Sequence, residues 1–328
     1  MGHTDAARGW DGDELDLDAY LDRIAFTGDL APTGETLRAL QRAHSAAIPF
    51  ENLEITLGRP VLLDLASLQD KMVRGSRGGY CFEHTRLFAA ALERLGFGVT
   101  GLASRVRMGS GKLRAATHAL LLVETEETAD GGARQLCDIG FGEGPIEPIR
   151  LVDGVESVQG GWRFRLERHN LADGLRAPGG DTGTGRSWKP VHGTGPDRPQ
   201  RGTDADGPHE WVLHALRQDG WLDLHGFTLD PHYPADYVVI NHYISTHPHS
   251  PFVDAPVIRR TGPEVLHGLN GTELTASRPD GSAERRRLEP GEVPKTLEDV
   301  FGIALDPADA TALTAYLVAH ATRNSEDG

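Results

Sequence analysis

The chain has 328 residues and a formal net charge of −15 at pH 7, and its 38% hydrophobic and 25% charged residues are typical of a globular protein of two or three domains rather than a disordered or fibrous one. The acidic balance argues against nucleic acid as a partner, because phosphate binding requires clustered lysine and arginine. No apolar run approaches the roughly 20 residues that cross a bilayer, and the polar stretch 1–18 lacks the apolar region of a secretory signal, so we expect a cytoplasmic protein that contacts no membrane.

Three amphipathic helices are predicted within the first 96 residues. Apolar side chains recur at three- and four-residue spacing in 15–24 and again in 33–47. The second of these helices should end before Pro49, because proline disfavours helical geometry in the residue that precedes it. A third helix is predicted to follow Cys81 and to end near Gly96, since glycine commonly terminates helices.

From residue 97 the sequence changes to short runs rich in β-branched and aromatic residues, separated by glycine, aspartate and asparagine. This pattern predicts an antiparallel sheet or barrel, with strands at 99–106, 118–123, 135–139, 162–166, 211–216 and 221–227. The last third mixes strands and helices. Its clearest helix is predicted to begin with Asp306 as N-cap and Pro307 in the first turn.

One segment of the strand-rich region, 173–208, is rich in glycine and proline and poor in apolar residues. Burial of so few apolar groups does not offset the conformational entropy that is lost on folding. We therefore predict a disordered insertion between two strands, with no catalytic residue.

The two cysteines are too few for a disulfide framework and fit a reducing compartment. Cys81 follows a Gly-Gly-Tyr sequence and precedes a predicted helix, so it should lie near a helix N-terminus, where N–H groups and the helix dipole favour a thiolate. Arg77 has the charge to assist. Taken alone, Cys81 could equally be a small buried apolar residue. Cys137 lies in an apolar strand without such surroundings and is predicted to be buried and structural.

A base and an orienting acid for this thiolate are found in two apolar strands. His118 begins one predicted strand and Asp138 lies in the next, and the polar link between them contains an Asp-Gly-Gly turn signal. A hairpin that turns near 128–131 places the two residues opposite, or within a few residues of, each other. A carboxylate is costly to bury without a partner, and a histidine N–H would satisfy it and fix the imidazole tautomer. The pair is either catalytic or a purely structural hydrogen bond.

Four blocks of the sequence resemble the arylamine N-acetyltransferases in their order and spacing. They are Ile48-Pro49-Phe50-Glu51-Asn52-Leu53, Arg77-Gly78-Gly79-Tyr80-Cys81-Phe82-Glu83, Thr117-His118 and Asp138-Ile139-Gly140-Phe141-Gly142. A later stretch, 241–252, also resembles the family, and the resemblance extends over most of the chain outside 173–208. The chain differs from the family pattern at Thr85, where an asparagine is expected, so local hydrogen bonding beside the cysteine should differ.

The resemblance implies an α+β fold with a cysteine-protease-like Cys-His-Asp core. Its parts would be a helical domain at 1–96, a central antiparallel β-barrel at 97–225 and a C-terminal α/β lid at 226–328. It implies a catalytic triad of Cys81, His118 and Asp138. By similarity, the cleft that receives CoA and the acceptor would be lined by Thr117, Phe141, Gly142 and Phe252, and its apolar floor shaped by Phe50 and Phe82.

The implied activity is acetyl transfer from acetyl-CoA, as co-substrate, through a Cys81 thioester to an arylamine or arylhydrazine in a ping-pong mechanism. A thiolate can be acylated reversibly by a thioester donor, and His118 can assist the attack of the amine as a general base. The tetrahedral oxyanion requires N–H donors, and the backbone N–H of Cys81 at the helix start is a candidate.

Three other functions are compatible with the sequence. An amide synthase that closes a macrolactam from a carrier-bound polyketide resembles the same family and would keep the triad. A cysteine hydrolase or transglutaminase-like enzyme contains Cys, His and Asp in the same order. A metal-binding module could use His242, His247 and His249, but Pro248 separates the last two and no cysteine pattern accompanies them, so we expect no bound metal.

Overall fold

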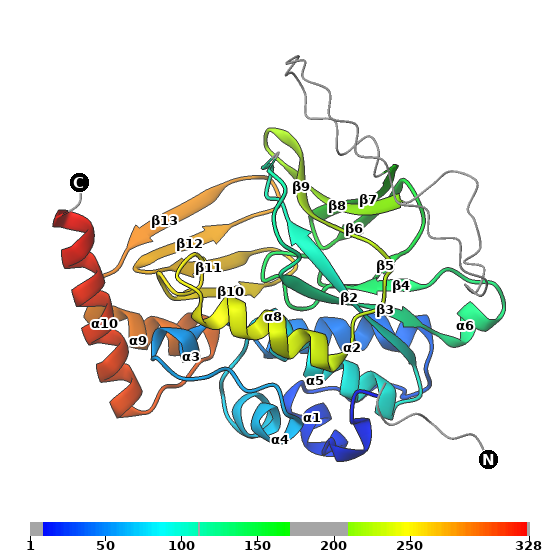
Figure 1. The fold of residues 1–328 in the computed structure, drawn as a ribbon, viewed down its shortest axis with the longest axis horizontal. Coiled ribbons are helices and arrows are strands. Elements are labelled where there is room, and N and C mark those ends of the chain that lie inside the picture. Colours follow the sequence, from blue (N-terminus) through cyan, green and yellow to red (C-terminus); the bar gives the residue numbers. More distant parts are fainter. Residues whose placement is uncertain (1–8, 111, 171–208, 327–328) are drawn as a thin grey trace, which may run out of the picture.

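The computed structural model describes residues 9–110, 112–170 and 209–326. Helices from the N-terminal part lie below a large curved sheet, and a second sheet lies beside it with the last helix at one end (Figure 1). This combination of helices and antiparallel strands confirms the predicted α+β class. The predicted insertion 173–208 lies outside the described residues. Within the described ranges, no helix is both long and apolar enough to cross a membrane.

The helical part closely follows the apolar pattern of the sequence. Thr33 caps the second helix by accepting a hydrogen bond from Thr36 N at 3.2 Å, and Gly96, at φ +89°, follows the fifth helix in the left-handed region that glycine adopts readily. The fifth helix is buried along most of its length and forms the centre of this part. The elements are α1 (Leu17–Arg23), α2 (Gly34–Ala47), α3 (Leu53–Thr56), α4 (Leu65–Leu68), a π-helical turn (Gln69–Arg74) and α5 (Cys81–Arg94).

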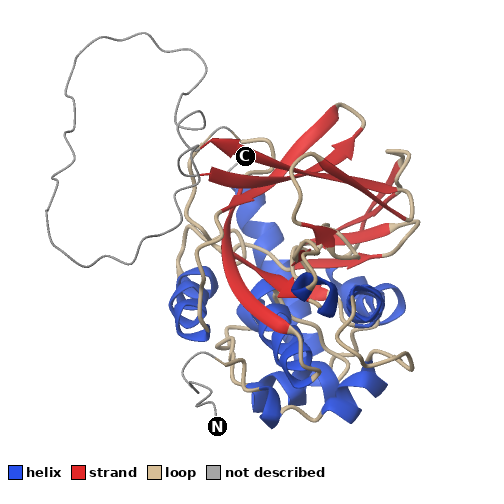
Figure 2. Cartoon of the chain, turned by 90° about the vertical axis from the view of Figure 1, so that its right-hand side faces the viewer, coloured by secondary structure: helices blue, strands red, loops and turns tan. Residues whose placement is uncertain are grey.

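The larger sheet has eight antiparallel strands and curls into a nearly closed barrel (Figure 2). Its strands are β2 (Gly98–Val106), β3 (His118–Glu124), β4 (Gln135–Cys137), β5 (Ile149–Arg150), β6 (Val155–Gln159), β7 (Trp162–Asn170), β8 (His209–Arg217) and β9 (Gly220–Phe227). Their order across the sheet is β5-β4-β3-β2-β9-β8-β7-β6. One face of β3 packs on α5, so the barrel and the helical part share a boundary at this strand.

The predicted hairpin between β3 and β4 is confirmed. Leu121 pairs with Cys137, and the short helix α6 (Glu126–Ala129) occupies the turn. The predicted strand 135–139 is too long, because the ladder ends at Cys137 and Asp138 lies just beyond it. The chain then crosses Cys81 so closely that a Cβ on Gly140 would lie 2.6 Å from the Cα of Cys81. Only glycine permits this approach.

A β-bulge interrupts the pairing of β8 and β9. Leu213 pairs with His225 and His214 pairs with Asp223, so Leu224 is an extra residue on β9. A bulge changes the alternation of side chains between the two faces of a sheet. Leu224 and His225 are both fully buried, whereas the Asp223 side chain is 40% exposed.

The second sheet combines one N-terminal strand with four C-terminal strands. Its order is β1 (Phe50–Glu51), β10 (Val257–Thr261), β11 (Leu266–Asn270), β12 (Glu273–Ser277) and β13 (Ala283–Arg287). The C-terminal helices are α8 (Pro234–Thr246), α9 (Val293–Thr296) and α10 (Pro307–Glu326). Asp306 caps α10, as predicted, by accepting a hydrogen bond from Asp309 N at 2.8 Å. The buried residues Tyr237 and Ile244 of α8 join the N-terminal core. The division into domains at 96 and 225 stays a prediction.

Candidate active site

Cys81 is the first residue of α5 and is only 4% exposed. The first turn is closed by Glu83, whose Oε2 accepts a hydrogen bond from Tyr80 N at 3.1 Å. The approach to the helix is tight, because a Cβ on Gly78 would lie 1.9 Å from the carbonyl oxygen of Pro49. The glycine turn therefore fixes the cysteine at the positive end of a helix.

The cationic residues near this turn are already paired with carboxylates. Arg77 lies 2.9 Å from Glu51 and 3.0 Å from Glu54, and Lys71 lies 2.7 Å from Glu83. The positive charge of Arg77 is therefore balanced within this cluster. The contribution of Arg77 to the cysteine stays a prediction, because its guanidinium is already ion-paired.

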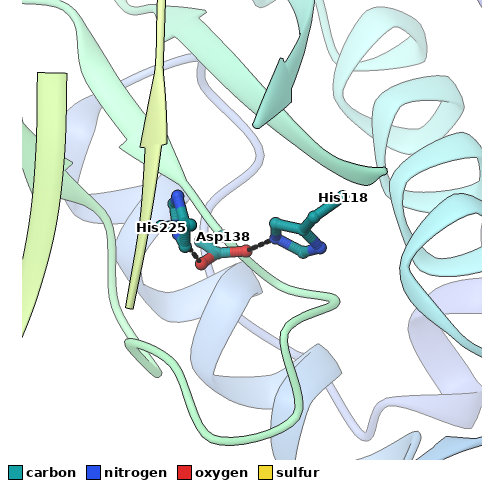
Figure 3. A group of neighbouring side chains, drawn as sticks. All are labelled: His118, Asp138 and His225. Carbon is teal, nitrogen blue, oxygen red and sulfur yellow. Dashed lines mark hydrogen bonds and ion pairs between the residues drawn. The ribbon is translucent and has the colours of Figure 1, made fainter. Parts of the chain in front are cut away.

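The structure brings together the three residues that the sequence predicted as a triad. His118 Nε2 lies 2.7 Å from Asp138 Oδ1, and both side chains are buried (Figure 3). The Cys81 side chain lies close enough to the His118 ring to raise its pKa. Since Nε2 faces Asp138, Nδ1 is the ring nitrogen left for the sulfur. The imidazole therefore lies between a thiol and a carboxylate.

His118 and Asp138 each stabilise the charged form of the other. Burial alone would lower the pKa of His118, but the charge of Asp138 and the hydrogen bonds with Asp138 and Cys81 raise that pKa to about 10. Burial alone would raise the pKa of Asp138, but His118 and His225 hold it well below its usual range. An imidazolium held by a carboxylate is the arrangement that favours a neighbouring thiolate.

His225 is a further member of the site that the sequence analysis missed. Its Nε2 lies 2.9 Å from Asp138 Oδ2, so each carboxylate oxygen contacts a different histidine (Figure 3). His225 is fully buried, and this burial lowers the pKa of His225 despite the nearby carboxylate. The neutral ring therefore donates its Nε2–H to Asp138. A histidine within the apolar run at 222–227 was the available signal, but the bulge hid the face on which it lies.

The three groups His118, Asp138 and His225 are also of the types that bind transition metals. Their contacts of 2.7 and 2.9 Å are ordinary hydrogen-bond lengths. Atoms bound to a common zinc ion at 2.0–2.1 Å and tetrahedral angles lie about 3.3 Å apart. The arrangement is therefore that of a hydrogen-bonded relay, which we call the inner relay.

Five of the six residues predicted for the cleft lie beside the triad or contact one another. The Phe141 ring lies 5.0 Å from the His118 ring, and the Phe50 ring lies 5.9 Å from that of Phe252. A Cβ on Gly142 would lie 3.2 Å from Phe50, and Thr117 directly precedes His118. A cavity beside them is lined by Phe50, Asp138, Gly142 and Arg259, among others.

Phe82 differs from the other predicted cleft residues because it is fully buried. Its ring contacts those of Tyr80 and Tyr237, with centroids 5.5 and 5.6 Å away. It can therefore support the turn at Cys81 only through its packing in the core, without contact with a substrate. The roles of all six residues in binding stay predictions.

Thr85 and Cys137 complete the surroundings. Thr85 donates its hydroxyl to the carbonyl oxygen of Ala119 at 3.2 Å, and so links α5 to the residue after His118. Cys137 is fully buried, as predicted, and burial together with Asp138 raises the pKa of its thiol well above the usual range. It therefore lacks the properties of a nucleophile.

Comparison with known proteins identifies the family. A family model described as N-acetyltransferase matches residues 33–177 and 181–310. The arylamine N-acetyltransferase of Mycobacterium tuberculosis is 34% identical over 294 residues, which cover 88% of this chain and 89% of that protein. The enzyme structure from Nocardia farcinica matches with a TM-score of 0.81 and 48% identity, over 96% and 99% of the two chains. The Mycobacterium marinum enzyme solved in complex with CoA matches with a TM-score of 0.74 and 32% identity, over 92% and 98%. The chain therefore belongs to the arylamine N-acetyltransferase family of transferases.

Proposed function

We propose that the protein transfers an acetyl group from acetyl-CoA to an arylamine or arylhydrazine by a ping-pong mechanism, with Cys81 as the acetyl carrier. The observation that carries this proposal is the placement of Cys81, at the start of α5, beside a His118 ring that is hydrogen-bonded to Asp138. A relative of the same fold was solved with CoA, which supports CoA as the donor's carrier.

In the first half-reaction the Cys81 thiolate attacks the carbonyl carbon of acetyl-CoA. The tetrahedral oxyanion would be met by the backbone N–H of Cys81 at the free start of α5. Collapse breaks the bond to the CoA sulfur, and the proton on His118 Nδ1 passes to this leaving thiolate. The products are acetyl-Cys81, CoA and a neutral His118.

In the second half-reaction the amine attacks acetyl-Cys81. Neutral His118 removes the proton from the attacking nitrogen as a general base. The Cys81 sulfur then leaves as a thiolate, which the new imidazolium stabilises. Asp138 keeps its charge throughout and holds the Nε2–H of His118, so that Nδ1 always faces the reaction.

His225 acts in this scheme as a positioning residue. Its Nε2–H occupies Asp138 Oδ2, which leaves only Oδ1 to face His118. A carboxylate that is fixed at both oxygens cannot rotate away from the imidazole. We propose that CoA and the acceptor occupy the cleft in turn, against Thr117, Phe141, Gly142 and Phe252, with Phe50 and Phe82 supporting its floor.

The test is intact mass spectrometry after the protein is mixed with acetyl-CoA and no acceptor. We expect one acetyl group on the wild type, located at Cys81 by peptide mapping, and its loss when an arylamine is added. Cys81→Ala should remain unlabelled, and Cys137→Ala, the matched control, should be labelled like the wild type. An acetyl group on Cys137 would contradict the assignment. A protein that is loaded only by a carrier-bound acyl chain would instead be the macrolactam-forming enzyme.

A further inference from the structure

The outer face of the barrel carries a second group of histidines and carboxylates. Glu167 and His169 lie two residues apart on β7, so their side chains share a face. His214 reaches Glu167 from β8, and Asp223 of β9 lies on the other side of His214. We call these four residues the outer cluster. It lies on the face of the sheet opposite to that of His225.

Three ligand atoms of the outer cluster converge on one point. Oε2 of Glu167 lies 3.1 Å from Nε2 of His214 and 3.4 Å from Nε2 of His169. All three atoms lie within 4.8 Å of one another. His214 is only 5% exposed, and neither of its ring nitrogens has a well-aligned hydrogen-bond partner among the described residues.

Two carboxylates face the ring of His214, one at each nitrogen. Its Nδ1 lies 2.8 Å from Asp223 Oδ1, and its Nε2 faces Glu167. A neutral imidazole has one N–H, so it can donate to only one of these carboxylates. If Nδ1 donates to Asp223, which is the shorter contact, the lone pair on Nε2 points at a carboxylate oxygen. Two such acceptors repel unless a cation lies between them.

We propose that the outer cluster binds a divalent transition-metal ion such as Zn²⁺, through Oε2 of Glu167, Nε2 of His169 and Nε2 of His214. Ligand atoms at 2.0–2.1 Å from a tetrahedral zinc ion lie about 3.3 Å apart, close to the 3.1 and 3.4 Å between these atoms. Imidazole and carboxylate are ordinary zinc ligands. The His169 side chain is 45% exposed, so a water molecule can reach the fourth position.

Residues around the three ligands complete the site. Asp223 Oδ1 lies 2.8 Å from Nδ1 of His214, which leaves Nε2 for the ion, and Arg165 Nε lies 3.0 Å from the other oxygen of Glu167. Carboxylates on ligating histidines and hydrogen bonds on ligating carboxylates are the usual outer partners of a metal site. The sequence predicts no metal because two of these ligands are separated from the third by more than forty residues of chain.

The ion would have a structural rather than a catalytic role. It would join β7 to β8 at the ends of these strands that border 171–208, on the far side of the sheet from the inner relay. Its removal should lower thermal stability and leave acetyl loading of Cys81 unchanged. Loss of acetyl loading alone would therefore count against the proposed function and not against this site.

The experiment is a titration of chelator-treated full-length protein with Zn²⁺ by calorimetry, and with Co²⁺ by absorption. We expect one equivalent to bind, a tetrahedral Co²⁺ spectrum without thiolate charge-transfer bands, and a melting temperature that rises with Zn²⁺. Glu167→Gln and His214→Ala should lose the bound equivalent. Asp223→Asn keeps all three ligands and should weaken binding by about tenfold or more. His249→Ala removes an exposed histidine elsewhere and should bind like the wild type.

Two results would overturn the site. One is stoichiometric binding that persists in His214→Ala, or that is lost in Cys81→Ala, because the ion would then lie elsewhere. The other is the absence of binding by the folded wild type, because the three ligand atoms would then lie close together without holding an ion. If His214→Ala does not fold, the affinities of Asp223→Asn and His249→Ala still separate the outcomes.

Discussion

The two cysteines are similarly buried but lie in different surroundings. Cys81 is 4% exposed and Cys137 is fully buried, so solvent contact hardly distinguishes them. Cys81 begins a helix, and its side chain interacts with the ring of His118. Cys137 is the last residue of β4, and the carboxylate of the next residue raises the pKa of its thiol further.

Asp138 acts on the two thiols in opposite directions. It disfavours the Cys137 thiolate directly, as one negative charge beside another. At Cys81 the same carboxylate acts through His118, because it stabilises the imidazolium that lies beside the sulfur. One buried charge therefore disfavours the Cys137 thiolate and raises the pKa of the histidine beside Cys81.

Replacement of Asp138 should have the largest effect on the difference between Cys81 and Cys137. In Asp138→Asn the amide no longer stabilises the imidazolium, and we expect the acetylation rate of Cys81 to fall by about 10³ to 10⁴, as in hydrolase triads that lose their acid. The measurement is single-turnover loading by acetyl-CoA. A loss of less than tenfold in the folded variant would show that His118 does not depend on this carboxylate.

Thiol alkylation should display the contrast in the wild type. At pH 7 we expect iodoacetamide to modify Cys81 more than about 100-fold faster than Cys137, because only the thiolate reacts. Peptide mapping of partially alkylated protein measures both rates. Unfolding in urea is the control, since it should make the two rates similar. Equal rates in the folded protein would refute the assignment of the nucleophile.

Replacement of His225 tests the role of Asp138 separately, since His225 contacts Asp138 but neither thiol. His225→Phe removes a hydrogen bond to a charged group, and such bonds contribute about 1.5–3 kcal/mol, or roughly 10- to 100-fold in rate. His225→Gln, which can donate an N–H, should recover part of the loading rate. A purely structural residue would instead lower stability in both variants without separating their rates or pH profiles.

The stability contributed by His118 should depend on pH. Its pKa is about 10 in the folded protein and 6.5 as the ordinary value, so the folded state binds the proton more tightly. This contribution is fully present below pH 6.5, declines above it and is lost as the pH rises through 10. Urea midpoints of the wild type should therefore fall between pH 6.5 and 10 more steeply than those of His118→Gln. Parallel profiles would contradict the raised pKa.

Cys137→Ser should have the smallest effect on activity. The hydroxyl enters a fully buried position, and we expect a loss of about 1–3 kcal/mol in the free energy of unfolding, because a buried polar group without a good partner is costly. Acetyl loading should remain within about twofold of the wild type at temperatures where the variant is folded. Urea unfolding and single-turnover kinetics measure the two effects.

Much of the fold was predictable because its signals are local. The apolar spacing of α1, α2 and α5, the cap at Asp306 and the β3–β4 hairpin each depend on a few adjacent residues. The hairpin brought His118 and Asp138 together for the same reason. The end of β4 was missed because it is set by the packing of Gly140 on Cys81, a contact between distant parts of the chain.

Residues that depend on long-range contacts could not be found in this way. His225 approaches Asp138 from a strand 87 positions later in the chain, and Arg77 is balanced by partners that only the folded turn supplies. The outer cluster requires β7, β8 and β9 to be paired first. Strand alternation predicts which residues share a face only while the ladder is regular.

The bulge at Leu224 allows three consecutive residues to serve three environments. Asp223 lies beside His214 on the outer face, Leu224 fills the apolar interior and His225 contacts Asp138. In a regular strand the first and third would point the same way. The extra residue thus places Asp223 and His225 on opposite faces of the sheet. Substitutions that change the charge on the outer face can therefore leave the contact between His225 and Asp138 unchanged.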